Sequence, residues 1–253
     1  MGYGVIKYRL VVLGILATQF VFAGEFTGVL DTSFGRNLSP ELPATSFSFE
    51  PELAYTWSKV NHVALYTYVD RPTDVYEKLT VPKTILSASR EFPVGLITLI
   101  PTLSVNFVSL DRWGIDGYQL RNSATLIGKY TSGGLTLKLR GGMYGMTTEY
   151  KSLADGARTA LFGFIQRADL SYEYGRLFIE AMLAIDQRHN GAVWINDYAT
   201  VEAIGYKITD SISLALNHSI LSSVIEASTG FRAPLRFGDG RDSRVGVTLE
   251  VGL

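Results

Sequence analysis

The chain has 253 residues, 23 basic and 24 acidic side chains, a formal net charge of −1 and no cysteine. The basic residues form no block of the kind that binds nucleic acid, and the lack of cysteine excludes both disulfides and a lipid-attachment site. The length beyond the N-terminal segment fits one folded domain.

The N-terminus has the pattern of an export signal. Lys7 and Arg9 precede the apolar run Leu10–Phe22, and Ala23 closes a short compact sequence of the type that signal peptidase reads. An uncleaved anchor helix is the alternative, but the run is short against the ~20 residues that span a bilayer. We therefore expect a signal peptide at 1–23, cleaved after Ala23, and a mature domain at 24–253.

Apolar residues occupy alternate positions in the segment Ser46–Trp57. Phenylalanine, proline, leucine and other aromatic residues occupy its odd positions, while Glu50 and Glu52 are among the even ones. Successive side chains point to opposite faces of a strand, so this segment predicts a strand with one apolar face. The pattern recurs along the chain and ends with apolar residues at alternate positions of 245–253. Repeated segments of about ten residues with this alternation are typical of a transmembrane β-barrel.

The remaining chain divides into about twelve such segments, since a spanning strand and its connection take on the order of 20 residues. The predicted strands are 25–34, 45–57, 62–70, 83–92, 98–108, 118–130, 135–145, 160–174, 176–186, 197–207, 211–221 and 243–253.

The predicted connections alternate between short and long. Short ones follow the even strands, as at Ser58–Asn61 and Gly175, whereas longer ones follow the odd strands, as at Arg71–Pro82, Gln187–Asn196 and Ser222–Asp242. Outer-membrane barrels have short periplasmic turns and longer extracellular loops. A soluble β-sandwich has no reason to alternate its loops in this way.

Aromatic residues lie near the predicted strand ends. Five even strands finish on one at the expected periplasmic side, and several odd strands carry one near the other side: Trp57, Phe92, Tyr130, Tyr174 and Tyr206, and then Phe34, Tyr68, Phe107 and Tyr144. Amphipathic rings collect at both membrane interfaces, so these residues predict two aromatic girdles. The general preference of aromatic residues for strands is the alternative explanation.

With these features the chain resembles a bacterial outer-membrane β-barrel protein of the porin-like type. Its last strand, Arg244–Leu253, is similar to the carboxy-terminal signal read by the barrel-assembly machinery, although that signal usually ends in phenylalanine. The resemblance implies an all-β, antiparallel up-and-down barrel in the outer membrane of a Gram-negative envelope. It implies contacts with outer-membrane lipid and lipopolysaccharide, with Arg232 and Arg236 as candidates for the phosphate groups.

Reading the alternation strand by strand separates inward-facing charges into two groups. A predicted basic wall comes from the sixth to eighth strands and a predicted acidic wall from the second and last strands: Arg121, Lys129, Lys138, Arg140 and Arg167, opposed to Glu50, Glu52 and Glu250. Opposed walls of charge create a transverse field that orients polar solutes and sets ion preference. This arrangement favours a narrow passive channel for small polar or charged solutes.

Two alternatives stay open. The charged groups pair across the lumen and plug a structural or adhesive barrel, because a twelve-stranded barrel lies between small filled barrels and wide porins. A less favoured alternative is an outer-membrane lipase or protease, which needs a histidine with nucleophilic and acidic partners near the outer rim. Of the three histidines, His62 lies beside a periplasmic turn, His218 has lipid-facing parity and His189 lies in a loop. The pattern shows no metal-ligand cluster and indicates no cofactor and no nucleic acid; oligomeric state is left open.

Overall fold

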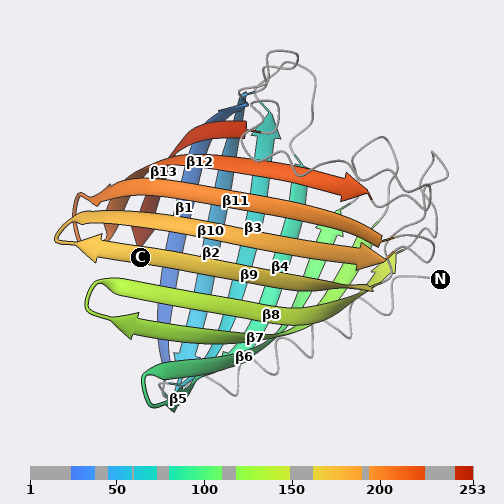
Figure 1. Cartoon of the computed structure of the whole chain (residues 1–253), viewed down its shortest axis with the longest axis horizontal. Helices are drawn as coiled ribbons and strands as arrows, with labels where there is room; N and C mark the ends of the chain where they lie inside the picture. The colour runs from blue at the N-terminus through green and yellow to red at the C-terminus, as the bar shows by residue number, and fades with distance from the viewer. Residues whose placement is uncertain are drawn as a thin grey trace.

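The strands of the computed structural model form one closed antiparallel barrel (Figure 1). It describes residues 24–37, 45–58, 60–72, 80–109, 118–148, 162–189, 194–225 and 243–252. The strands are β1 (Gly24–Asn37), β2 (Thr45–Trp57), β3 (Asn61–Pro72), β4 (Thr80–Arg90), β5 (Phe92–Val94), β6 (Ile97–Ser109), β7 (Tyr118–Ser132), β8 (Leu135–Thr148), β9 (Phe162–Tyr174), β10 (Leu177–His189), β11 (Trp194–Lys207), β12 (Ile212–Ile225) and β13 (Ser243–Gly252). The predicted all-β class is confirmed.

The barrel closes through the first and last strands. β1 pairs with β2 on one side and with β13 on the other, and the pairing of β4 with β6 completes the ring. The short β5 follows β4 after Glu91 and also pairs with β6, so both belong to one wall position. In the described residues the ring therefore has the twelve positions expected from the sequence.

One face of the sheet is apolar and exposed, as a lipid-facing surface requires. Phe47, Phe49 and Leu53 on β2 are 43%, 38% and 52% exposed, and equally large side chains on other strands, such as Leu103 and Leu139, are more than half exposed. Residues paired across antiparallel strands lie on the same face. The strand register therefore identifies the outer-face residues of each neighbouring strand around the barrel. The alternate residues face the lumen.

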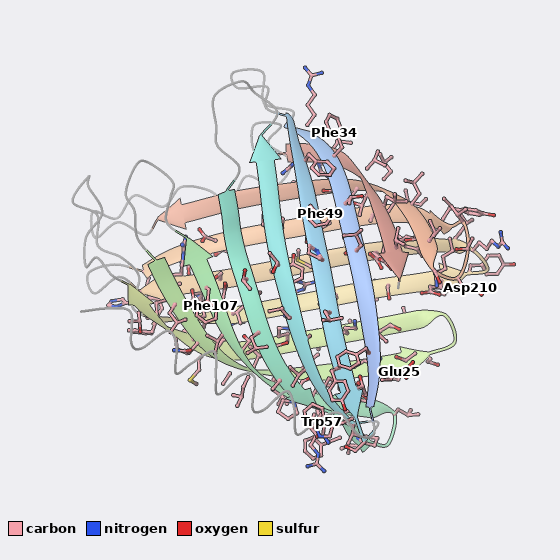
Figure 2. The ribbon with its side chains drawn as sticks, turned by 180° about the vertical axis from the view of Figure 1, so that it is seen from behind. Glu25, Phe34, Phe49, Trp57, Phe107 and Asp210 are labelled. Carbon is pink, nitrogen blue, oxygen red and sulfur yellow. The ribbon has the colours of Figure 1, made fainter. Side chains whose placement is uncertain are left out.

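Aromatic side chains lie at both ends of the outer face (Figure 2). Phe26, Tyr55 and Trp57 form a ladder at the end with the short turns, which the sequence predicts to be periplasmic, with ring centroids 4.6 Å and 6.1 Å apart. At the other end Trp194 packs against Phe162 and Phe164. The prediction was wrong for Tyr68 and Tyr144. Their register partners put both residues on the lumen face, because they share parity with the inward residues of β3 and β8.

The connections on the periplasmic side are tight. Gly133 and Gly175 adopt φ values of +59° and +60° in two of these turns, a backbone region that suits glycine. The long connection predicted at Gln187–Asn196 is wrong, since β10 runs to His189 and β11 starts at Trp194. The expected signal peptide, 1–23, lies outside the described residues. Among those residues, no helix is long and apolar enough to span a membrane.

Candidate functional site: the charged lumen

The structure places the five residues of the predicted basic wall on the lumen face of β7, β8 and β9. Lys129 lies directly opposite Lys138, and Arg140 lies directly opposite Arg167. Like charges in such facing positions repel one another and are destabilising in a sheet. These facing like charges therefore lower the stability of the wall.

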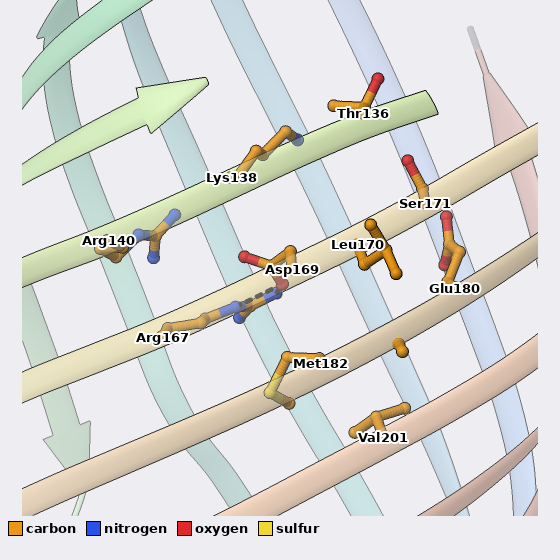
Figure 3. A pocket seen from close by; sticks show the side chains of 11 residues that line it. Thr136, Lys138, Arg140, Arg167, Asp169, Leu170, Ser171, Glu180, Met182 and Val201 are labelled. Atoms are coloured by element: carbon orange, nitrogen blue, oxygen red, sulfur yellow. Dashed lines mark hydrogen bonds and ion pairs between the residues drawn. The ribbon is translucent and has the colours of Figure 1, made fainter. Parts of the chain in front are cut away.

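A cavity of about 310 Å³ lies against this part of the wall (Figure 3). Its charged lining comes from three strands: Lys138 and Arg140 on β8, Arg167 and Asp169 on β9, and Glu180 on β10. Arg167 is neutralised by Asp169, whose carboxylate accepts from its Nε at 2.7 Å. In the described part of the chain, Lys129, Lys138 and Arg140 form no ion pair, and the buried Nε of Arg140 has no hydrogen-bond partner. These three residues are called the basic cluster below.

Arg121 differs from the basic cluster because it belongs to a network. Its guanidinium lies 3.4 Å from the ring centroid of Tyr144 and 3.2 Å from the carboxylate of Asp186 on β10. The Tyr144 hydroxyl also donates to Asp186. Tyr144 reaches across β9 only because Gly163 is its partner there, since a Cβ on Gly163 would lie 2.4 Å from the tyrosine hydroxyl. This network connects β7, β8 and β10 toward the end of the barrel opposite the short turns.

The opposite side of the barrel carries a row of carboxylates. Asp31 on β1 lies directly between Glu50 on β2 and Glu250 on β13, which the closure of the barrel brings together. Tyr66 and Ser48 donate hydrogen bonds to Glu50, whereas the buried Oδ1 of Asp31 has no partner among the described residues. The predicted Glu52 lies on the same face, opposite Val29.

Asp31 was missing from the predicted acidic wall. The alternation in the sequence indicates its inward orientation. Phe26, Leu30 and Phe34 lie on the outer face of the same strand, and Asp31 lies on the opposite face. Glu250, Asp31 and Glu50 are called the acidic row below. Lumen parity holds for all eight predicted wall residues, and their role in a permeation path stays a prediction.

The ion pairs of the lumen run along the wall. Arg121 pairs with Asp186, Arg167 with Asp169, Arg188 with Asp197, and Lys207 with Glu173, all on β7 to β11. Within the described ranges, none of them connects the basic cluster to the acidic row. The described side chains therefore do not form the charge pairs across the lumen that the plugged alternative requires.

The histidines lie in three different environments. His62 has lumen parity, with Nδ1 2.8 Å from the Thr56 hydroxyl and Nε2 3.8 Å from Glu91 near the periplasmic rim. His189, predicted in a loop, ends β10 and packs on the rings of Phe162 and Trp194. His218 lies on the outer face, as its parity predicted, 3.9 Å from Glu202. In the described portion no group of three metal-ligating side chains is assembled. Arg232 and Arg236 lie outside that portion.

Known structures share this fold at low sequence identity. An outer membrane channel from Pseudomonas putida F1 superposes with a TM-score of 0.59 at 8% identity over 92% of this chain and 97% of that one. The KdgM porin in complex with disordered oligogalacturonate gives 0.53 at 10% identity, over 88% and 98%. In-vitro folded OmpT of Vibrio cholerae in its trimer form gives 0.51 at 9%, over 92% and 100%. The chain thus has the fold of bacterial outer-membrane β-barrel proteins. No family model and no curated sequence matches it.

Proposed function

We propose that the protein is an outer-membrane channel that lets small polar or charged solutes diffuse through a narrow lumen. The observation that carries this proposal is the direction of the ion pairs. They neutralise charges along the β7–β11 wall and, among the described residues, leave the basic cluster and the acidic row without an ion pair on different sides of the lumen. A solute or water that passes between them meets cationic donors on one side and carboxylate acceptors on the other.

The polar groups between the charged regions support the same function. Ser104 and Ser123 bond to each other at 2.6 Å on β6 and β7, and Asn217 donates to Thr248 at 2.6 Å on β12 and β13. A lumen lined by hydroxyl and amide groups is wettable, unlike an apolar core. The solved channel and porin with this fold are consistent with the proposal, and the oligogalacturonate complex makes acidic sugars a sensible first set of solutes for this chain.

Single-channel recording on refolded protein in a planar bilayer tests the proposal. We expect discrete open steps whose amplitude falls when small polyethylene glycols enter the lumen and recovers with larger ones that are excluded. Liposome swelling with neutral and charged sugars of equal size then measures the solute preference. A folded barrel that is electrically silent at all voltages and gives no swelling would refute the channel and favour a structural barrel.

Hydrolytic activity is tested separately with phospholipid and peptide substrates. His62 is the histidine to replace, because it is the one with lumen parity and a neighbouring hydroxyl and carboxylate. Turnover by a wild-type barrel that shows no conductance, lost in His62→Gln, would replace the channel proposal with an enzymatic one.

A further inference from the structure

The outer face of the barrel carries an acid–base pair in the middle of its apolar surface. Glu202 on β11 and His218 on β12 are register partners, and their side chains approach to 3.9 Å. The Glu202 side chain is 72% exposed and that of His218 is 37% exposed. Ionisable groups that face lipid are costly, so such a pair needs an explanation.

The pair does not lie at a membrane interface. Tyr206, on the same face of β11, marks the periplasmic girdle, and Trp194 marks the opposite end of the strand. A tilted strand gains roughly 2.5 Å of depth per residue, which places Glu202 about 10 Å inside the girdle of an apolar band about 25 Å tall. Lipid headgroups therefore do not reach the pair.

Both small and large side chains surround the pair on the outer face. Ala181 lies opposite Glu202 on β10 and Thr200 lies beside it on β11, whereas Ile204 on β11 and Val245, opposite His218 on β13, are larger. Beside the pair lies an apolar groove of about 320 Å³ lined by residues such as Leu177, Ile204, Leu214 and Val247. Ala181, Thr200, Glu202, His218 and this groove are called the β11–β12 patch.

We propose that the β11–β12 patch is the contact between two copies of the chain in the membrane. Two copies in the same orientation are related by an axis along the membrane normal, and a two-fold contact places the same patch on both sides. Because Glu202 and His218 are register partners on adjacent strands, this axis brings Glu202 of each copy close to the histidine of the other. A lipid chain offers neither group a hydrogen bond.

The shape of the patch fits this occupant. Small residues allow two membrane-embedded backbones to approach closely, and the adjacent groove receives large apolar side chains from the other copy. His218 donates to a carboxylate from one ring nitrogen whether it is neutral or protonated, so the contact does not require a charged histidine.

Sedimentation equilibrium of the full barrel in detergent tests this contact. We expect a dimer for the wild-type protein and at least a tenfold weaker dimer for Glu202→Leu and for His218→Leu. The exchanged double variant E202H/H218E restores the pair across the axis and should recover wild-type association. Leu103→Ala, on the outer face of β6 away from the β11–β12 patch, is the control and should leave association unchanged.

Cross-linking in lipid vesicles gives a second measurement, made simple by the absence of native cysteine. Oxidation should convert Thr200→Cys to a covalent dimer and leave Leu103→Cys monomeric. The circular dichroism of every variant shows that the barrel is folded, independently of its association and of its conductance. A wild-type protein that is monomeric at all concentrations, or single variants that associate like the wild type, would overturn the proposal.

Discussion

Reversal of one charge in the basic cluster should change the ion preference of the lumen by a predictable amount. Lys138 is the best position, because it lines the cavity and forms no ion pair in the described part of the chain. One unit charge acts on a monovalent ion about 6 Å away in water with about 0.7 kcal/mol. Lys138→Glu changes this interaction energy by about 1.4 kcal/mol, which corresponds to a factor of about ten in the local concentration of a monovalent cation.

Salt screens this interaction, and the dependence on salt concentration can be measured. With a Debye length of about 8 Å at 0.15 M salt, the factor becomes roughly three in favour of cations. At 1 M salt, where the Debye length is about 3 Å, the difference from wild type should almost vanish. Reversal potentials across a planar bilayer with a KCl gradient measure both quantities.

Arg90→Glu is the matched control for this experiment. Arg90 undergoes the same change of charge but lies exposed near the periplasmic end of β4, with its guanidinium 5.1 Å from the centroid of the Phe92 ring. It should leave the reversal potential close to that of the wild type. Equal shifts in both variants, or no shift in Lys138→Glu at low salt, would show that Lys138 does not face the permeation path.

Three further predictions concern stability and processing. Gly163→Ala places a methyl group 2.3 Å from the Gln187 carbonyl oxygen and 2.4 Å from the Tyr144 hydroxyl, so it should lower unfolding stability in lipid vesicles by about 1–3 kcal/mol. Gly145→Ala on β8, which meets nothing within 4 Å, should be neutral, and equal losses would contradict this reasoning. Asp31→Asn removes repulsion from Glu50 and Glu250 and should raise the denaturation midpoint, by about 0.2–1 kcal/mol of stability; a lower midpoint would show that the charge is stabilising. Intact-mass measurement of protein from the outer membrane should give a chain that begins at Gly24, and a mass that includes Met1 would contradict the signal peptide.

The strands and their inner and outer faces were predictable because lipid imposes a simple rule. Every second residue of a spanning strand has to be apolar, so Phe47, Phe49 and Leu53 identify the outer face of β2 without any knowledge of its neighbours. The same rule, applied to Tyr144, would have placed it in the lumen beside Lys138 and Arg140. Its assignment to the girdle relied on position near the strand end and ignored parity.

The electrostatic arrangement of the lumen was predictable only in part. Parity indicates that Arg121 and Lys138 face inward, but the register between separate strands decides which of them is neutralised. Arg121 meets Asp186 across two intervening strands, and nothing near either residue in the sequence indicates this contact. Asp31 lies between Glu50 and Glu250 only because the ends of the chain meet when the barrel closes.

The direction of the ion pairs also explains how a narrow barrel can carry many charges in its lumen. A pair formed across the lumen would place two long side chains in the path, whereas a pair along the wall, such as Arg167 with Asp169, holds both side chains close to the sheet. Pairing along β7–β11 thus contributes to wall rigidity without using the basic cluster or the acidic row. Those groups form no ion pair among the described residues, at the cost of repulsion between facing like charges. We expect Asp31→Asn to stabilise the barrel and also to weaken its cation preference. This result would show that the carboxylates that select cations are the ones that lower the stability of the barrel.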